Sequence, residues 1–181
     1  MNVPPTGTIT FLFSDIEGSS KKWDQQPDAM RVALGAHDRM LRETFEACGG
    51  FVFKTVGDAF CVAFDTATDA LAGALESQRA LRAADWSAIG EMKVRMALHT
   101  GAAEQRDGDY FGQSLNRVAR ILAAAHGGQV LLSLPRLNTS AASFEAIALA
   151  LPGRYPASAA SQLAGSDPNN PKRTALKFLD I

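Results

Sequence analysis

The sequence predicts an α+β fold in which helices pack on one face of a β-sheet, and three observations support this prediction. Strand-like and helix-like segments alternate along the chain in the order β-α-β-β-α-β-α-β. The 181 residues suit one domain, 1–181, and 46% of them are hydrophobic, which is enough to bury one core. Apolar residues occur at both odd and even positions of the segment 8–13, so both faces of this strand carry apolar side chains. The second face of the sheet is therefore expected to need cover as well.

The first half of the chain is predicted to form a strand, a long helix and a hairpin. Residues 8–13 are β-branched or aromatic, which favours a strand. Over 28–48, apolar residues recur at spacings of three, four and seven, which is typical of a helix. The apolar runs 51–55 and 59–64 flank the turn 56–58, and together they predict a β-hairpin.

The second half continues with helices and strands and then changes character. Its predicted elements are helices at 68–83 and 113–125 and strands at 93–100, 129–133 and 177–181. Residues 135–171 are rich in Ala, Ser, Pro and Asn and have weak periodicity, so they are expected to be mostly loop, with room for a short helix over 142–151.

Composition narrows the class of protein. The formal net charge of −1 argues against a nucleic-acid-binding protein, which would be distinctly basic. No apolar run reaches membrane-spanning length, and residues 1–7 lack the basic and apolar pattern of a signal peptide. Cys48 and Cys61 lie within apolar patterns, so we expect two buried thiols in a reducing, cytoplasmic compartment.

The first candidate site is the turn Ser14–Ser20 (SDIEGSS), where a strand ends and a helix begins. The free backbone N–H groups of a helix N-terminus bind phosphate oxygens, and an aspartate beside them can hold a metal ion. Taken alone, a strand followed by aspartate and glycine is usually only a turn. The combination nevertheless makes Asp15 a candidate metal ligand.

Two further segments carry polar residues that could take part in catalysis or metal binding. Asp58 lies at the tip of the predicted hairpin, where it could join Asp15 to form a two-metal phosphoryl site. Asn116 and Arg120 are four residues apart and therefore share one face of the predicted helix. Each feature alone is more often a turn residue or a solvated helix face.

Together these segments resemble the catalytic domain of the class III adenylyl/guanylyl cyclases, in particular the bacterial members. The resemblance covers residues 8–133 and rests on the motifs FSDIEGSS, FKTVGDAF, LHTG and DYFGQSLNRVAR in this order, whereas 134–181 diverges. It implies a ferredoxin-like (βαββαβ) α+β sandwich with helices on one sheet face and the other face used for dimerisation. It also implies conversion of ATP to 3′,5′-cyclic AMP and pyrophosphate in signal transduction.

The resemblance assigns roles to residues of this chain. Asp15, Ile16 and Asp58 match the ligands of two divalent metal ions, Mg²⁺ or Mn²⁺. Asn116 and Arg120 match the pair that orients the ribose and holds charge in the transition state. The matched substrate-binding residues are Lys54, Asp109, Ile16, Glu17, Gly18, Ser19 and Ser20.

Hydrogen-bond types indicate which base is bound. Adenine presents an acceptor at N1 and a donor at N6, whereas lysine only donates and ionised aspartate only accepts. Lys54 and Asp109 therefore fit adenine, and guanine would present the reverse pattern to both. Three alternatives remain open: a guanylyl cyclase, a nucleotide-sensing module without turnover, and a diguanylate cyclase, although no GGDEF-like segment is present.

The resemblance further implies a homodimer with two shared sites. One chain supplies the metal ligands, and the other supplies the base-reading and transition-state residues. The tail departs from the family pattern, so a weak dimer is expected, and Lys172 or Arg173 could supply a triphosphate-binding cation. The implied mechanism uses no histidine: His99 is expected in a strand, and His37 and His126 at the surface or at helix ends.

Overall fold

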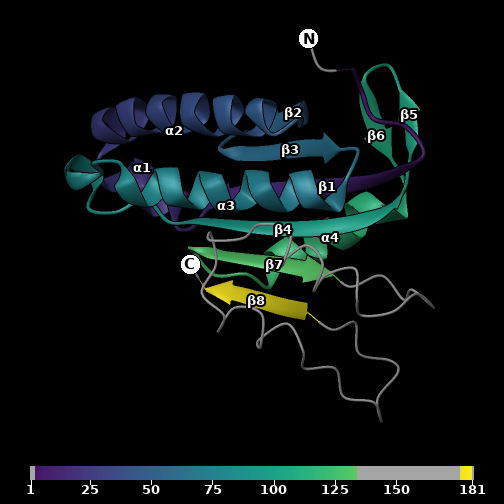
Figure 1. The fold of residues 1–181 in the computed structure, drawn as a ribbon. Helices are drawn as coiled ribbons and strands as arrows, with labels where there is room; N and C mark the ends of the chain where they lie inside the picture. The colour runs from purple at the N-terminus through teal and green to yellow at the C-terminus, as the bar shows by residue number, and fades with distance from the viewer. Residues whose placement is uncertain (1–2, 134–175, 181) are drawn as a thin grey trace.

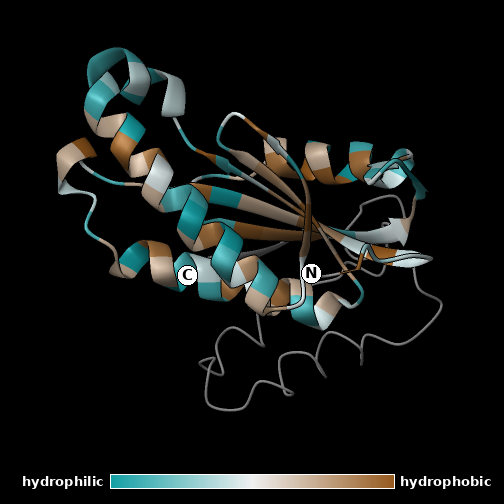
Figure 2. Cartoon of the chain, turned by 90° about the horizontal axis from the view of Figure 1, so that it is seen from above, coloured by the Kyte–Doolittle hydropathy of each residue, from teal (hydrophilic) through white to brown (hydrophobic). Residues whose placement is uncertain are grey.

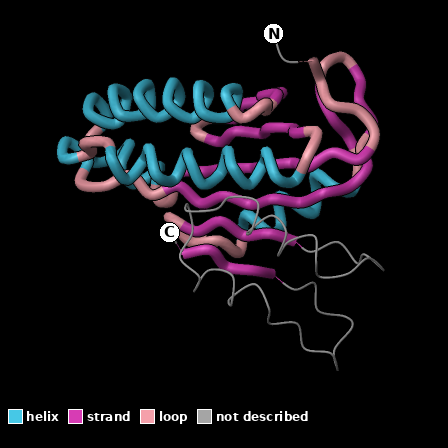
Figure 3. Tube along the Cα trace, viewed as in Figure 1, coloured by secondary structure: helices cyan, strands magenta, loops and turns pink. Residues whose placement is uncertain are grey.

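The computed structural model describes residues 3–133 and 176–180, which form one large sheet, a small two-stranded sheet and the helices around them (Figures 1 and 3). The strands are β1 (Thr8–Ile16), β2 (Phe51–Val56), β3 (Ala59–Phe64), β4 (Val94–Ala102), β5 (Glu104–Arg106), β6 (Asp109–Phe111), β7 (Gln129–Ser133) and β8 (Leu176–Asp180). The helices are α1 (Ser19–Gln25), α2 (Pro27–Ala47), α3 (Ala67–Ala83), the 3₁₀ turn η1 (Ser87–Ile89) and α4 (Gln113–Ala123).

The six-stranded sheet has the order β2-β3-β1-β4-β7-β8. β1 is antiparallel to both β3 and β4, and β2 and β3 form the predicted hairpin. With α2 and α3 as the crossover helices, the first four strands of the chain build the expected βαββαβ arrangement. β7 then adds parallel to β4, and β8 adds antiparallel to β7. The predicted α+β fold class is confirmed.

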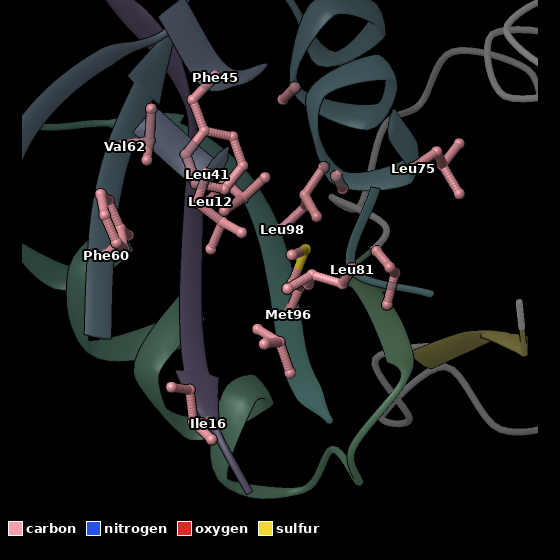
Figure 4. Packing of buried hydrophobic residues seen from close by; sticks show 14 of the residues in the cluster. Leu12, Ile16, Leu41, Phe45, Phe60, Val62, Leu75, Leu81, Met96 and Leu98 are labelled. Atoms are coloured by element: carbon pink, nitrogen blue, oxygen red, sulfur yellow. The ribbon is translucent and has the colours of Figure 1, made fainter. Parts of the chain in front are cut away.

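α2 and α3 cover one face of the sheet and bury the larger part of the core. Alternate residues of β1, including Leu12 and Ile16, point to this side. The ring of Phe45 on α2 meets Phe60 edge-on at a centroid distance of 5.9 Å and Phe64 at 6.5 Å. Figure 4 shows these aromatic and aliphatic side chains converging between the helices and the strands.

The expectation that all helices lie on one face is wrong for α4. This helix packs against β4, β1 and β7 on the opposite face, where Val118 and Ile121 join Ile9 and Phe11 in a second core cluster. The physical reason is that the odd-numbered residues of β1 are as apolar as the even-numbered ones. In Figure 2 the most hydrophobic segments are the central strands, with helices on both sides of them.

Two smaller expectations can also be compared with the structure. Cys48 and Cys61 form no disulfide and are partly buried rather than fully buried. His37 is not at the surface: it is fully buried on α2 with its ring edge-on to Phe60, and this burial lowers its pKa. His99 lies within β4 as expected, and His126 is exposed.

The expected helix over 142–151 and the candidate cations Lys172 and Arg173 lie outside the described residues. Within the part of the chain that is described, no helix is long and apolar enough to cross a membrane. The helix expected to begin at the turn Ser14–Ser20 is the short α1, separate from α2, and the β5–β6 hairpin was not predicted.

Gly50 provides a test of how tightly α2 is joined to β2. A Cβ atom at this position would lie 2.7 Å from Cζ of Phe64 and 2.8 Å from the carbonyl oxygen of Phe45. We expect Gly50→Ala to lower the free energy of unfolding by roughly 1–3 kcal/mol, because the backbone must shift to relieve these contacts. Urea unfolding followed by circular dichroism measures this, with Gly35→Ala on α2 as the control because a Cβ there meets nothing within 4 Å.

Candidate active site

The two aspartates proposed as metal ligands lie at the same end of the sheet. Asp15 is the penultimate residue of β1, and Asp58 lies in the turn between β2 and β3. The backbone N–H of Ile16 donates a hydrogen bond to Oδ2 of Asp58, with an N–O distance of 3.2 Å. This bond fastens the hairpin turn to the end of β1 and brings the second carboxylate beside the first.

Arg95 is a functional candidate that the sequence reasoning missed. It lies on β4 directly opposite Asp15, and its Nε donates to Oδ2 of Asp15 at 2.9 Å, with Nη2 bonded to the same oxygen. A guanidinium suits bidentate binding of carboxylates and phosphates. The signal in the sequence was a lone arginine within the apolar run 94–98, but its partner depends on the register between two strands.

The donor set fits hard divalent cations. Two carboxylates and the main-chain carbonyl of Ile16 offer oxygen ligands, which Mg²⁺ and Mn²⁺ prefer. Among the residues that the structure describes, no three acidic, histidine or cysteine side chains cluster. Protein oxygens from Asp15, Asp58 and Ile16 would therefore leave coordination positions for phosphate oxygens and water.

The turn between β1 and α1 has the geometry of an anion-binding loop in part. Gly18 adopts a left-handed conformation with φ of 69° and caps α1 without a side-chain hydrogen bond. Backbone N–H groups in the first turn of a helix have no acceptor within that helix, which leaves those of Ser19 and Ser20 available. The N–H of Ile16 and of Glu17 are already engaged, by Asp58 and by the carbonyl of Lys93.

Lys54 and Asp109 meet although 55 residues separate them in the sequence. The ammonium Nζ of Lys54 donates to Oδ2 of Asp109 at 2.5 Å, and Oδ1 of Asp109 accepts from the N–H of Tyr110 at 2.8 Å. The hydrogen bond between the two side chains holds the pKa of Asp109 below its usual range and raises the pKa of Lys54. Both groups are therefore charged at neutral pH.

This ion pair lines an open pocket of about 550 Å³ on the sheet face that carries α4. Asn116 on α4 also lines the pocket, as do Phe13 of β1 and Cys61 of β3. Burial raises the pKa of Cys61 to about 11, so the thiol next to Lys54 stays protonated and neutral. The pocket therefore combines an apolar floor with the donor Lys54, the acceptor Asp109 and the amide of Asn116.

Tyr110 holds Asp109 in place. Its hydroxyl donates to the carbonyl of Pro5 at 2.7 Å, and its ring meets Phe53 edge-on at a centroid distance of 4.9 Å and Phe11 at 5.4 Å. The side chain is 2% exposed, so β6 is anchored to the sheet through this residue. This anchor could not be predicted from the sequence, because it joins a short strand to the N-terminal segment.

The structure does not bring all the predicted site residues together. Lys54, Asp109 and Asn116 line one pocket, and Asp15, Ile16 and Asp58 lie at the end of β1. Arg120 is exposed one helical turn beyond Asn116 and is not among the pocket-lining residues. One chain thus displays two groups of candidate residues and an outward-pointing arginine.

Comparison with known proteins identifies the family. The sequence model for the adenylate and guanylate cyclase catalytic domain matches residues 1–146. The chain belongs to this family. Among solved structures, an adenylate cyclase of Trypanosoma brucei in its monomeric state superposes with a TM-score of 0.68 and 28% identity, covering 71% of this chain and 74% of that one.

Other cyclase-family proteins give the same picture. An adenylate/guanylate cyclase/hydrolase from Silicibacter pomeroyi superposes with a TM-score of 0.64 and 27% identity, over 70% of this chain and 76% of that one. An uncharacterized protein of Mycobacterium tuberculosis is 40% identical over 133 residues, covering 72% of this chain and 44% of the relative. The adenylate cyclase of Neurospora crassa is 36% identical over 155 residues, covering 72% of this chain but 7% of that enzyme. The chain thus spans less than half the length of these curated relatives.

Proposed function

We propose that this cyclase domain is an adenylate cyclase that converts ATP to 3′,5′-cyclic AMP and pyrophosphate. The observation that carries the proposal is the ion pair between Lys54 and Asp109 at the wall of the open pocket. A fixed donor beside a fixed acceptor is the pattern that adenine requires, with N1 accepting from lysine and N6 donating to aspartate. Guanine would place its N1–H against the ammonium and its O6 against the carboxylate, and both contacts would be repulsive.

The two side chains now bond to each other, so each must turn toward the base when ATP enters. Both are charged, and Lys54 is half exposed, so the pair exchanges one set of charge-assisted hydrogen bonds for another. The apolar floor made by Phe13, Phe53 and the neutral thiol of Cys61 would lie against the face of the purine. Shape and hydrogen-bond type together favour adenine.

The reaction joins the ribose O3′ to the α-phosphorus and breaks the bond from that phosphorus to the bridging oxygen of pyrophosphate. The 3′-hydroxyl loses its proton, and pyrophosphate carries away the electron pair. Asn116 would hold the ribose, and Arg120 would donate to the α-phosphoryl oxygens as negative charge gathers there. Free N–H groups of Ser19 and Ser20 would bind phosphate oxygens.

Asp15, Asp58 and the carbonyl of Ile16 would hold two divalent metal ions, Mg²⁺ or Mn²⁺. Bound there, the ions would lower the pKa of the 3′-hydroxyl and neutralise charge on the phosphates. The guanidinium of Arg95 now neutralises Asp15. Once Asp15 binds a cation, this guanidinium would be free to turn toward the phosphates.

We also propose that the active unit is a homodimer in which each site is shared. Asn116 and Arg120 would serve the nucleotide held by Asp15 and Asp58 of the other subunit. The outward position of Arg120, beyond the pocket of its own chain, supports this assignment. Exposed apolar residues near the pocket, Val56 and Phe111, would lie at or near the contact. Two cysteines that form no disulfide fit a cytoplasmic location, and residues 1–181 would form one catalytic domain.

Product analysis tests the choice of base. We expect cyclic AMP from ATP, and little cyclic GMP from GTP, with either Mg²⁺ or Mn²⁺. In the double variant Lys54→Glu with Asp109→Cys, the ratio of kcat/KM for ATP to that for GTP is expected to fall at least about tenfold, because both hydrogen bonds to adenine are lost. A double variant with an unchanged ratio would mean that the base is recognised elsewhere.

A further inference from the structure

Glu17 lies in the middle of the proposed phosphate-binding turn, yet its polar groups bind other parts of the chain. Its backbone N–H donates to the carbonyl of Lys93 at 2.9 Å, just before β4. Its carboxylate Oε1 accepts from the backbone N–H of Gly127 at 2.9 Å, across 110 residues of sequence. Both bonds tie the turn to segments outside the nucleotide pocket.

The contact depends on the absence of a side chain at Gly127. A Cβ atom at Gly127 would lie 2.5 Å from Cβ of Lys93 and 2.7 Å from Oε2 of Glu17, so only glycine allows the approach. The neighbouring Gly128 donates its N–H to the carbonyl of Val94 at 2.9 Å. The loop that joins α4 to β7 is therefore held against the end of β1 and the start of β4.

The turn itself offers little to fix its own position. Gly18 caps α1 with no side-chain hydrogen bond, and α1 has no fully buried residue, although Trp23 packs partly buried against the larger core cluster. A second external tie is the bond from Nζ of Lys22 to the carbonyl of Ile89, at 2.9 Å. The orientation of the free N–H groups in the turn is thus set largely by contacts with other segments.

The bond to Gly127 also determines where the negative charge of Glu17 lies. A carboxylate in a turn that binds a triphosphate would repel the substrate if its side chain faced the phosphates. Accepting from Gly127 directs this charge toward a backbone N–H on the loop after α4. The contact therefore positions the turn and also keeps the negative charge of Glu17 away from the phosphate oxygens.

We propose that Glu17 is a positioning residue, which fixes the phosphate-binding turn by bonding to Gly127. This inference rests on the proposed function, since it assigns the turn to the nucleotide phosphates. Glu17 then acts on the nucleotide through the backbone of residues 18–20 rather than by touching it. The contact also joins this turn to the loop that follows α4, the helix on which Asn116 and Arg120 lie.

Steady-state kinetics with ATP provides the test. Glu17→Ala is expected to lower kcat/KM roughly tenfold, mainly through a higher KM, because the N–H groups of the turn lose their fixed orientation. Glu17→Gln retains an oxygen that accepts from Gly127, so it is expected to keep activity within about threefold of wild type. Glu43→Ala, which removes an exposed carboxylate from α2, is the matched control and should change nothing.

A double-mutant cycle separates this contact from a general loss of structure. Gly127→Ala disrupts the same contact from the other side, so the double variant Glu17→Ala with Gly127→Ala should be no worse than the more damaging single variant. Additive losses would overturn the proposal, as would a Gln variant as impaired as the Ala variant. If Gly127→Ala does not fold, the comparison of the Ala and Gln variants still decides.

One measurement is independent of catalysis. Hydrogen exchange of the Gly127 amide, followed by NMR, should be slow in wild type and in Glu17→Gln and markedly faster in Glu17→Ala. Equal exchange rates of the Gly127 amide in wild type and in both variants would show that Glu17 does not hold this amide, whether or not the protein turns over ATP. Absence of cyclic AMP formation by wild type would instead overturn the proposed function. The exchange measurement would still show whether Glu17 bonds to Gly127.

Discussion

Replacing Asp58 by alanine is expected to lower the rate of cyclic AMP formation by about 100-fold or more while the fold persists. The variant removes one of the two carboxylates at the end of β1, and with it a charge that the proposed metal ions need close to the phosphates. Asp58 lies in a hairpin turn rather than in either core cluster, so little packing is lost. Rates are measured with saturating ATP at several concentrations of Mn²⁺.

The variant Asp58→Asn makes this test sharper. Its amide oxygen can still accept from the N–H of Ile16, so the bond that fastens the hairpin to β1 is kept while the charge is lost. We expect it to be nearly as inactive as the alanine variant. Asp24→Ala, which removes an exposed carboxylate from α1, serves as the control. Full activity of the Asn variant, or of wild type in excess chelator, would contradict the metal assignment.

The contact between Asp15 and Arg95 could be predicted only in part from the sequence. A strand-end aspartate followed by a turn was enough to predict that Asp15 and Asp58 would meet, because a hairpin and a neighbouring strand end at the same edge. The arginine could not be predicted, since its position opposite Asp15 follows from the register of β1 with β4. Register depends on packing on both faces of the sheet rather than on any local pattern.

The sheet face on which α4 packs could not be predicted for a similar reason. Its periodicity indicated which stripe is buried, and Val118 and Ile121 are indeed buried. Periodicity does not say which sheet face receives a helix, so the position of α4 opposite α2 and α3 could not be predicted. The bond between Glu17 and Gly127 is hidden in the same way, because a glycine after a helix usually marks only the helix end.

Part of the grouping of the candidate site residues could be predicted from the sequence, and part could not. The family resemblance supplied Lys54, Asp109 and Asn116 as one functional set, and the structure places all three around one pocket. Arg120 belongs to the same proposed set; it is exposed on α4 and is not among the residues that line the pocket. Asp15 and Asp58 do not line this pocket, and the shared-site proposal has the partner chain supply them, which leads to the last prediction.

Two inactive variants of this protein are expected to restore each other's activity when mixed. Asp58→Ala protein retains the residues Lys54, Asp109, Asn116 and Arg120, while Arg120→Ala protein retains Asp15 and Asp58. A mixed dimer has one site in which every required residue is present and one site that lacks both. With random pairing, about half of the dimers are mixed and each has one good site of two, so activity should reach roughly a quarter of wild type.

The matched control is a mixture of Asp58→Ala and Asp15→Ala proteins. Both variants are damaged in the same group of residues at the end of β1, so no pairing yields a complete site and activity should stay at the level of the separate variants. If the dimer is weak, recovery in the first mixture should grow with total protein concentration, because association follows mass action. Recovery in the control mixture would show that Asp15 and Asp58 of one site come from different chains. No recovery in the first mixture, at concentrations where wild type is active, would show that each site is built within one chain. Arg120 would then have to reach the pocket by a movement of α4, against the packing of Val118 and Ile121 on the sheet.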